Sequence, residues 1–231
     1  MKIFINRQKV KARALWSNAA SVGGLLLLLA SVLLPLFLPQ RLTLAYVLMI
    51  AGLGVAMVGI YFANRWVRKP RPEDSLAKAL KSFDDSYRLY HYPALPCDHL
   101  LLTPTGVVIL EVFNLDGRFS YRQGRWKEAM TIGRALRYIV EEHIGDPVAL
   151  AHQLQKDLDL RFKREFGANA VIPIKTVVAF THPAAELDVK EPPIPICKVE
   201  KLKKQISFST PRLTNELYEK VARFLESLTT K

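Results

Sequence analysis

Two long apolar stretches near the N-terminus dominate the hydrophobic pattern of this 231-residue chain. Residues 19–38 and 43–63 are uncharged, and each is long enough to cross a hydrocarbon core of about 30 Å as a helix. The link between them, Pro39-Gln40-Arg41, leaves room only for a tight hairpin. A cleaved signal peptide is the alternative for the first stretch, but no small-residue cleavage site follows and a second apolar stretch begins at once. The pattern therefore predicts a transmembrane helical hairpin.

The rest of the chain alternates between helical and strand-like patterns. Apolar residues recur at helical spacing in three segments, and the segments between them are short and rich in β-formers. The predicted helices cover residues 72–83, 147–166 and a C-terminal segment from about 211. The predicted strands cover 87–92, two segments within 98–117, 119–126, 174–181 and 196–199, and residues 132–144 favour helix over strand. This order fits an α/β fold with a mixed sheet flanked by helices.

Small residues lie four positions apart at three places in the apolar stretches, namely Ala19 and Gly23, Ala20 and Gly24, and Gly52 and Ala56. Such pairs let helix backbones approach closely, so they predict close helix packing and allow helix–helix self-association in the membrane. The alternative is that Gly and Ala are simply common in membrane helices.

Charge is divided unevenly along the chain. The sequence has 33 Lys and Arg against 21 Asp and Glu, a net charge of +12, but the first 69 residues hold nine cations and no acid. The remainder is close to neutral, so the basic total does not indicate a nucleic-acid surface. Five cations precede the first apolar stretch and four follow the second. By the positive-inside rule this predicts that both termini and the soluble domain are cytoplasmic.

Two acidic residues stand out in the middle of the soluble part. Residues 98–117 read as two apolar strands joined by a tight Thr-Gly turn, with Asp98 opening the first strand and Glu111 near the end of the second. Side chains alternate along a strand, so Glu111 shares a face with Ile109 and Phe113. An ionised Glu in so apolar a strand is costly unless it is paired, binds a metal or enters a cleft. Two carboxylates on adjacent strand ends suit Mg²⁺, which binds one or two carboxylates with water and phosphate.

These residues carry a family resemblance. Glu73, Asp98 and the run Glu111-Val-Phe113-Asn-Leu-Asp-Gly117 resemble the NERD (nuclease-related) domain over about residues 73–166, with looser agreement to about 181. The resemblance implies a PD-(D/E)xK-like core in which Asp98 and Glu111 bind magnesium or manganese and, with Glu73, form the catalytic set. Glu73 also has a simpler explanation, because acids favour the first turn of a helix.

The chain departs from the family pattern at two places. The family pattern has Lys two residues after Glu111, to position or activate the attacking water, and this chain has Phe113. Loss of one preorganised electrostatic group typically lowers the rate by about 10²–10³-fold. The family also favours Pro-x-x-Gln at the start of the next helix, whereas Pro147 is followed here by Leu150 and Gln153 comes one turn later.

Several polar residues after the acidic pair are candidates for contact with a nucleic-acid substrate. They are Arg118, Arg122, Arg125, Lys127 and Gln153. One of the cations could also replace the missing Lys, if the fold brings it to Glu111.

Three functions remain open. The favoured hypothesis is a membrane-anchored cytoplasmic nuclease-related domain that associates with nucleic acid and whose catalysis is degraded or lost because of Phe113. The alternatives are an active metal-dependent nuclease acting on DNA or RNA, and a non-enzymatic membrane scaffold or protein-interaction module. The expected partners are the lipid bilayer and DNA or RNA. The predicted organisation is a basic N-terminus (1–18), two spans (19–63), a linker (64–72) and a NERD-like α/β domain (73–231).

Overall fold

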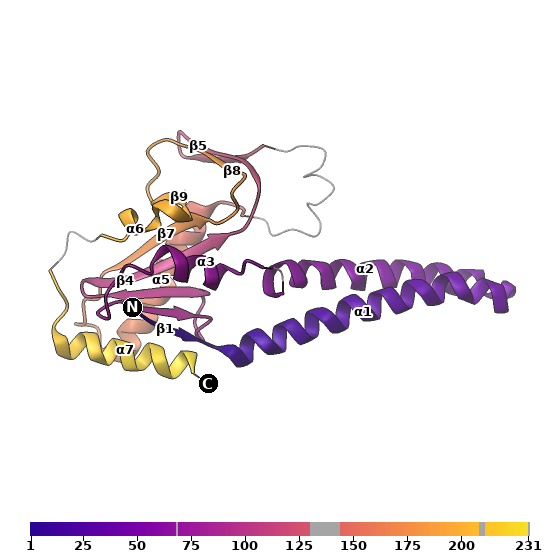
Figure 1. Ribbon diagram of the computed structural model, residues 1–231, viewed down its shortest axis with the longest axis horizontal. Coiled ribbons are helices and arrows are strands. Elements are labelled where there is room, and N and C mark those ends of the chain that lie inside the picture. Colours follow the sequence, from indigo (N-terminus) through magenta and orange to yellow (C-terminus); the bar gives the residue numbers. More distant parts are fainter. Residues whose placement is uncertain (68, 130–143, 208–210, 231) are drawn as a thin grey trace. The chain divides into compact units, whose positions relative to one another are not determined.

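The computed structural model describes residues 1–67, 69–129, 144–207 and 211–230. The chain divides into two compact units. The α/β unit comprises Met1–Arg7, Pro72–Ala129 and Ile144–Lys231, and the helical unit contains Gln8–Arg71 (Figure 1). The helix expected over residues 132–144 falls, except for its last residue, outside the part of the chain that is described.

The helical unit is a pair of long helices. Helix α1 (Arg7–Phe37) and helix α2 (Leu42–Trp66) are joined by the 3-10 turn η1 (Pro39–Arg41). By length and composition, both helices could cross a membrane. The two predicted apolar stretches are therefore helical. Helix α1 begins well before residue 19, because the basic segment that precedes the apolar stretch continues the same helix.

In each of the two helices the buried positions are spaced by seven, and most of them hold small residues. The buried positions are Val10, Ser17, Gly24 and Ser31 in α1, and Ala45, Gly52, Gly59 and Trp66 in α2. A Cβ atom added at Gly24 would lie 2.5 Å from the backbone nitrogen of Ala56, whereas one added at Gly23 would meet nothing within 4 Å. Gly24 and Gly52 therefore allow close packing inside the hairpin. Self-association between copies stays a prediction.

The α/β unit is built on a six-stranded mixed sheet, as predicted. Its strands, in spatial order, are β1 (Lys2–Ile5), β2 (Arg88–His91), β3 (His99–Thr103), β4 (Gly106–Phe113), β7 (Ile174–Phe180) and β9 (Ile196–Lys198). Strand β3 runs antiparallel to both β2 and β4, and the other neighbouring pairs are parallel. This arrangement places β3, which Asp98 immediately precedes, beside β4, which carries Glu111, in the middle of the sheet.

The edge strand β1 was not predicted. The sequence analysis placed residues 1–18 outside the α/β domain, but β1 pairs in parallel with β2, with Lys2 beside Arg88 and Ile5 beside His91. The ring of Phe4 stacks on Tyr90 with 5.0 Å between centroids. The α/β unit therefore begins before the helical hairpin and resumes after it.

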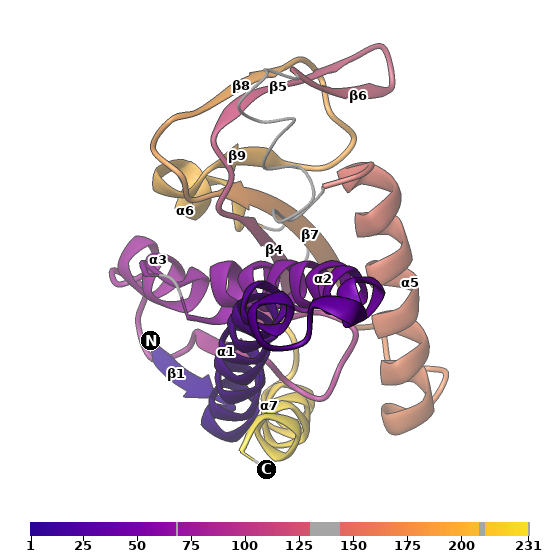
Figure 2. The same cartoon turned by 90° about the vertical axis from the view of Figure 1, so that its right-hand side faces the viewer.

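Helices cover both faces of this sheet (Figure 2). On one face, α5 (Pro147–Phe166) and α7 (Asn215–Thr229) pack on a core that includes Tyr90, Leu100 and Ile109. On the other face, α3 (Pro72–Ala79) and the short α6 (Leu202–Gln205), which follows the 3-10 turn η2 (Val199–Lys201), pack on a core that includes Leu101 and Leu110. Helix α5 begins as predicted, because the Asp146 side chain accepts a hydrogen bond from the backbone N–H of Val148 at 2.9 Å.

A second, three-stranded sheet has the order β6-β5-β8. Strands β5 (Gly117–Arg122) and β6 (Arg125–Glu128) form a hairpin in the segment where a strand or hairpin arm was expected. Strand β8 (Ala185–Val189) pairs in parallel with β5, although the sequence around it reads as a Pro-rich loop. One face of this sheet contributes Phe119 and Leu187 to a third core cluster.

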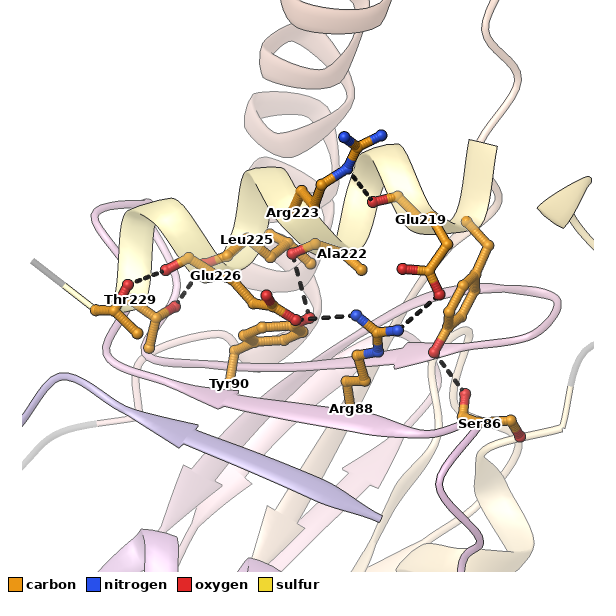
Figure 3. Close-up of polar contacts among 11 residues, drawn as sticks. Ser86, Arg88, Tyr90, Glu219, Ala222, Arg223, Leu225, Glu226 and Thr229 are labelled. Atoms are coloured by element: carbon orange, nitrogen blue, oxygen red, sulfur yellow. Dashed lines mark hydrogen bonds and ion pairs between the residues drawn. The ribbon is translucent and has the colours of Figure 1, made fainter. Parts of the chain in front are cut away.

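Polar contacts from β2 fix the C-terminal helix on the sheet (Figure 3). The Arg88 guanidinium contacts the carboxylates of Glu219 at 2.7 Å and Glu226 at 2.9 Å. The hydroxyl of Tyr90 donates to the carbonyl of Ala222 at 3.4 Å, and burial raises the pKa of this phenol. These contacts anchor α7, while Asp98 lies at the far end of the loop that follows β2.

Candidate functional site: an acidic pair at the ends of two central strands

The register of the central strands indicates that Asp98 and Glu111 lie close together. The antiparallel pairing of β3 with β4 ends with Leu100 opposite Ile109, and the same register extended by two residues would place Asp98 opposite Glu111. The backbone N–H of Tyr92 donates to the carbonyl of Asp98 at 2.6 Å, which likewise extends the pairing of β2 with β3 to Asp98. Directly opposite residues in an antiparallel pair have their Cβ atoms about 4.5–5.5 Å apart on the same face.

The acidic pair belongs to the face of the sheet that α5 covers. Ile109, two residues before Glu111, packs in the core formed with α5 and α7, and Phe113, two residues after it, packs against Ala151 of α5. Asp98 and Glu111 are both half-buried. Both residues are therefore partly accessible to solvent, next to strands that are otherwise buried.

Glu73 is held differently. It lies in the first turn of α3, on the helix whose Leu76 packs against the opposite face of the sheet. Its side chain is 3 % exposed, and its Oε2 atom accepts a hydrogen bond from the hydroxyl of Tyr92 at 2.8 Å. Among the described residues, no group of three or more His, Cys, Asp or Glu side chains could hold a metal ion, so Glu73 does not join the acidic pair as a third ligand.

Phe113, which stands where the family has Lys, belongs to a cluster of aromatic side chains. Phe113 is 4 % exposed, and its ring lies 5.9 Å from that of Phe180. The Phe180 ring also lies 4.7 Å from Phe119 and 6.2 Å from Trp126. The side chain two residues after Glu111 is therefore fully engaged in apolar packing.

The cations predicted to contact substrate lie on the small sheet. Arg118 forms an ion pair with Glu186 at 2.6 Å, and Arg122 pairs with Asp188. The register of β5 with β6 places Ser120 opposite Lys127 and Arg122 opposite Arg125, so the four cations share one exposed face. This face lines a hollow of about 620 Å³ that includes Arg118, Ser120, Lys127, Glu186 and Asp188. Two of the four cations are thus already paired with acids of β8.

Gln153 lies on the exposed side of α5. Its amide donates to both carboxylate oxygens of Asp157, at 3.0 and 3.1 Å. The buried stripe of the same helix runs through Ala151, Leu154 and Leu158, and Gln153 is not part of it. The contacts of Gln153 are therefore those of a solvent-facing helix residue.

Sequence reasoning missed a buried polar cluster next to Asp98. The Nδ1 atoms of His91 and His99 lie 2.9 Å apart, and the Tyr92 ring meets the edge of His99 with 5.0 Å between centroids. Burial, with a smaller effect from His99, lowers the pKa of His91 well below its ordinary value. The only sequence signal is the run Tyr-His-Tyr before the loop, which does not reveal the contacts.

The donor set at the acidic pair fits a hard divalent cation. Two half-buried carboxylates on neighbouring strands can bind Mg²⁺ or Mn²⁺, which complete their coordination with water and phosphate oxygens. The same pair does not fit a structural zinc site, which needs four protein ligands.

Fold and site together define a mixed α/β domain with two apolar helices attached and an acidic pair at its sheet. Residues 71–181 match the family model of the nuclease-related domain, NERD. This match confirms the resemblance to the NERD family over that part of the chain. No curated protein and no solved structure matches the chain.

Proposed function

We propose that this protein is a membrane-anchored nuclease-related domain that binds nucleic acid and a divalent cation but does not hydrolyse its ligand efficiently. In this proposal, Asp98 and Glu111 bind the cation, which would contact a phosphate of the nucleic acid. Nuclease activity would also need a group that positions or activates water beside Glu111.

The observation that carries this proposal is the environment of Phe113. Its ring occupies the E-x-K lysine position and is buried against Phe180. A missing preorganised charge lowers a rate by about 10²–10³-fold. Arg118 and Arg122, two of the cations that could compensate, are paired with Glu186 and Asp188. The domain therefore keeps the two carboxylates, but a buried aromatic ring replaces the family's lysine.

The proposed location is the cytoplasmic face of a membrane, with two spans. Strand β1 precedes the helical hairpin and pairs with β2, which follows it. This pairing supports a topology with both ends of the hairpin on the same side of the bilayer and an even number of crossings. The excess of cations on both flanks of the hairpin favours the cytoplasm as that side.

The test uses the full-length protein purified in detergent. It is incubated with labelled single- and double-stranded DNA and RNA in Mg²⁺ or Mn²⁺, and both binding and product formation are measured. We expect binding that weakens as salt rises, with the substrate left intact. Glu111→Ala should reduce the cation-dependent part of the binding.

Two other outcomes would contradict the proposal. Cleavage by the wild type that Glu111→Ala abolishes would establish the active nuclease, which the juxtaposition of Asp98 with Glu111 favours. Neither binding nor cleavage, in a preparation that is folded by circular dichroism, would leave the membrane scaffold as the function.

A further inference from the structure

We propose that Tyr92 is a positioning residue that holds Asp98 opposite Glu111, and that Glu73 acts on this pair through Tyr92 rather than as a metal ligand. This inference rests on the proposed cation site and adds to it the contacts that fix one of its two carboxylates.

Tyr92 makes two hydrogen bonds to two different parts of the domain. Its hydroxyl donates to Oε2 of Glu73 at 2.8 Å, and its backbone N–H donates to the carbonyl oxygen of Asp98 at 2.6 Å. A single residue thus connects the first turn of α3 with the residue that precedes β3. Movement of Tyr92 would displace the backbone of Asp98.

The backbone of Tyr92 adopts an unusual conformation that makes both contacts possible. Its φ is 59°, in the left-handed region that residues with a Cβ atom rarely adopt. Regular alternation along β2 would place the Tyr92 side chain on the face of Tyr90, under α7. The observed side chain lies instead against His99 and reaches Glu73. Backbone strain that the surrounding structure enforces is common at functional sites.

The surroundings of the Tyr92 ring leave it little freedom. Tyr92 is 3 % exposed, and its ring meets the edge of His99. His99 in turn is fixed by the 2.9 Å contact between its Nδ1 and that of His91. The phenol is therefore held by the histidine pair on one side and by the Glu73 carboxylate at its tip.

Glu73 is placed to support Tyr92 and not to join the acidic pair. It is almost fully buried and lies on α3, which covers the face of the sheet opposite to that of Glu111. Its Oε2 atom is occupied by the Tyr92 hydroxyl. A carboxylate that supports Tyr92 by accepting its hydrogen bond can be replaced in that role by an amide oxygen, whereas a carboxylate that binds a cation cannot.

The test is a Mn²⁺ titration of the full-length protein in detergent, with free Mn²⁺ followed by electron paramagnetic resonance. Tyr92→Phe should weaken Mn²⁺ binding about tenfold, the typical effect of losing a residue that orients a metal ligand. Glu73→Ala should have a similar effect. Glu73→Gln should bind Mn²⁺ as the wild type does, because its amide oxygen still accepts from the Tyr92 hydroxyl.

Tyr90→Phe is the matched control. It removes another buried tyrosine hydroxyl two residues away, in β2, one that bonds to Ala222 of α7, and should leave Mn²⁺ affinity unchanged. Circular dichroism verifies the fold of each variant. If Tyr92→Phe does not fold, the comparison of Glu73→Gln with Glu73→Ala decides.

Several results would overturn the inference. Wild-type affinity in Tyr92→Phe, or equal losses in Tyr92→Phe and Tyr90→Phe, would show that Tyr92 has no specific effect on the site. Equally weak binding by Glu73→Gln and Glu73→Ala would mean that the charge of Glu73 itself is needed. If the wild type binds no Mn²⁺, this inference and the proposed cation site both fail, whereas wild-type binding with unaffected variants removes the inference alone.

Discussion

At the scale of single residues, the proposed loss of nuclease activity rests on Phe113. Glu111 is half-buried and can meet solvent, but the side chain two residues later is enclosed by Phe180 and other core residues. An ammonium group placed there would lose its hydration without gaining a partner. Phe113 is therefore part of the packed core, so replacing it with Lys alone would not restore a working site.

Phe113→Lys should consequently lower stability without producing a nuclease. We expect a loss of roughly 3 kcal/mol or more in the free energy of unfolding, comparable with truncation of a buried Phe. Phe113→Leu, which keeps an apolar side chain, should cost less. Thermal unfolding in detergent and a Mn²⁺-dependent cleavage assay measure the two effects. Cleavage by Phe113→Lys at wild-type stability would show that the site accepts the cation.

The sequence predicts the approach of Asp98 to Glu111 but not the contact of Tyr92 with Glu73. The approach of Asp98 to Glu111 follows from strand alternation and from one tight turn, both of which are visible in the sequence. The contact of Tyr92 with Glu73 depends on a positive φ and on packing between α3 and the sheet. No local pattern encodes either feature, so the sequence left Glu73 open between a catalytic carboxylate and an acid in the first turn of a helix.

At the scale of elements, the sequence predicted the two long helices but not the edge strand β1. The apolar stretches are long enough to define α1 and α2 on their own. Strand β1 has only four residues next to a basic segment, and β8 lies between prolines, so only pairing with β2 and β5 reveals them. Short strands of this kind depend on tertiary context more than on propensity.

The pairing of β1 with β2 gives a prediction about the hairpin. In intact cells, a membrane-impermeant maleimide should label Gln40→Cys, in the turn η1, but not Lys81→Cys, which is exposed in the α/β unit. The native thiols, Cys97 and Cys197, are buried and provide a low background. Permeabilised cells should show labelling of both variants. Labelling of Lys81→Cys in intact cells with protection of Gln40→Cys would reverse the orientation.

At the scale of the whole molecule, the sequence of the α/β unit is interrupted by the helical hairpin. Residues 1–7 belong to the same compact unit as residues 72–129. A soluble fragment that starts after the hairpin would lack β1 and expose the edge of β2, which invites aggregation. The full-length chain is therefore the proper material for assays of this protein.

The central claim is that Asp98 and Glu111 form one divalent-cation site. Its most direct test is Mn²⁺ titration of the full-length wild type, Asp98→Asn, Glu111→Gln and the double variant. The account predicts that the wild type has a site which either single substitution abolishes, and that the double variant is no weaker than the single ones, because both carboxylates bind the same ion. Equal Mn²⁺ binding by all four proteins, or none by the wild type, would contradict it.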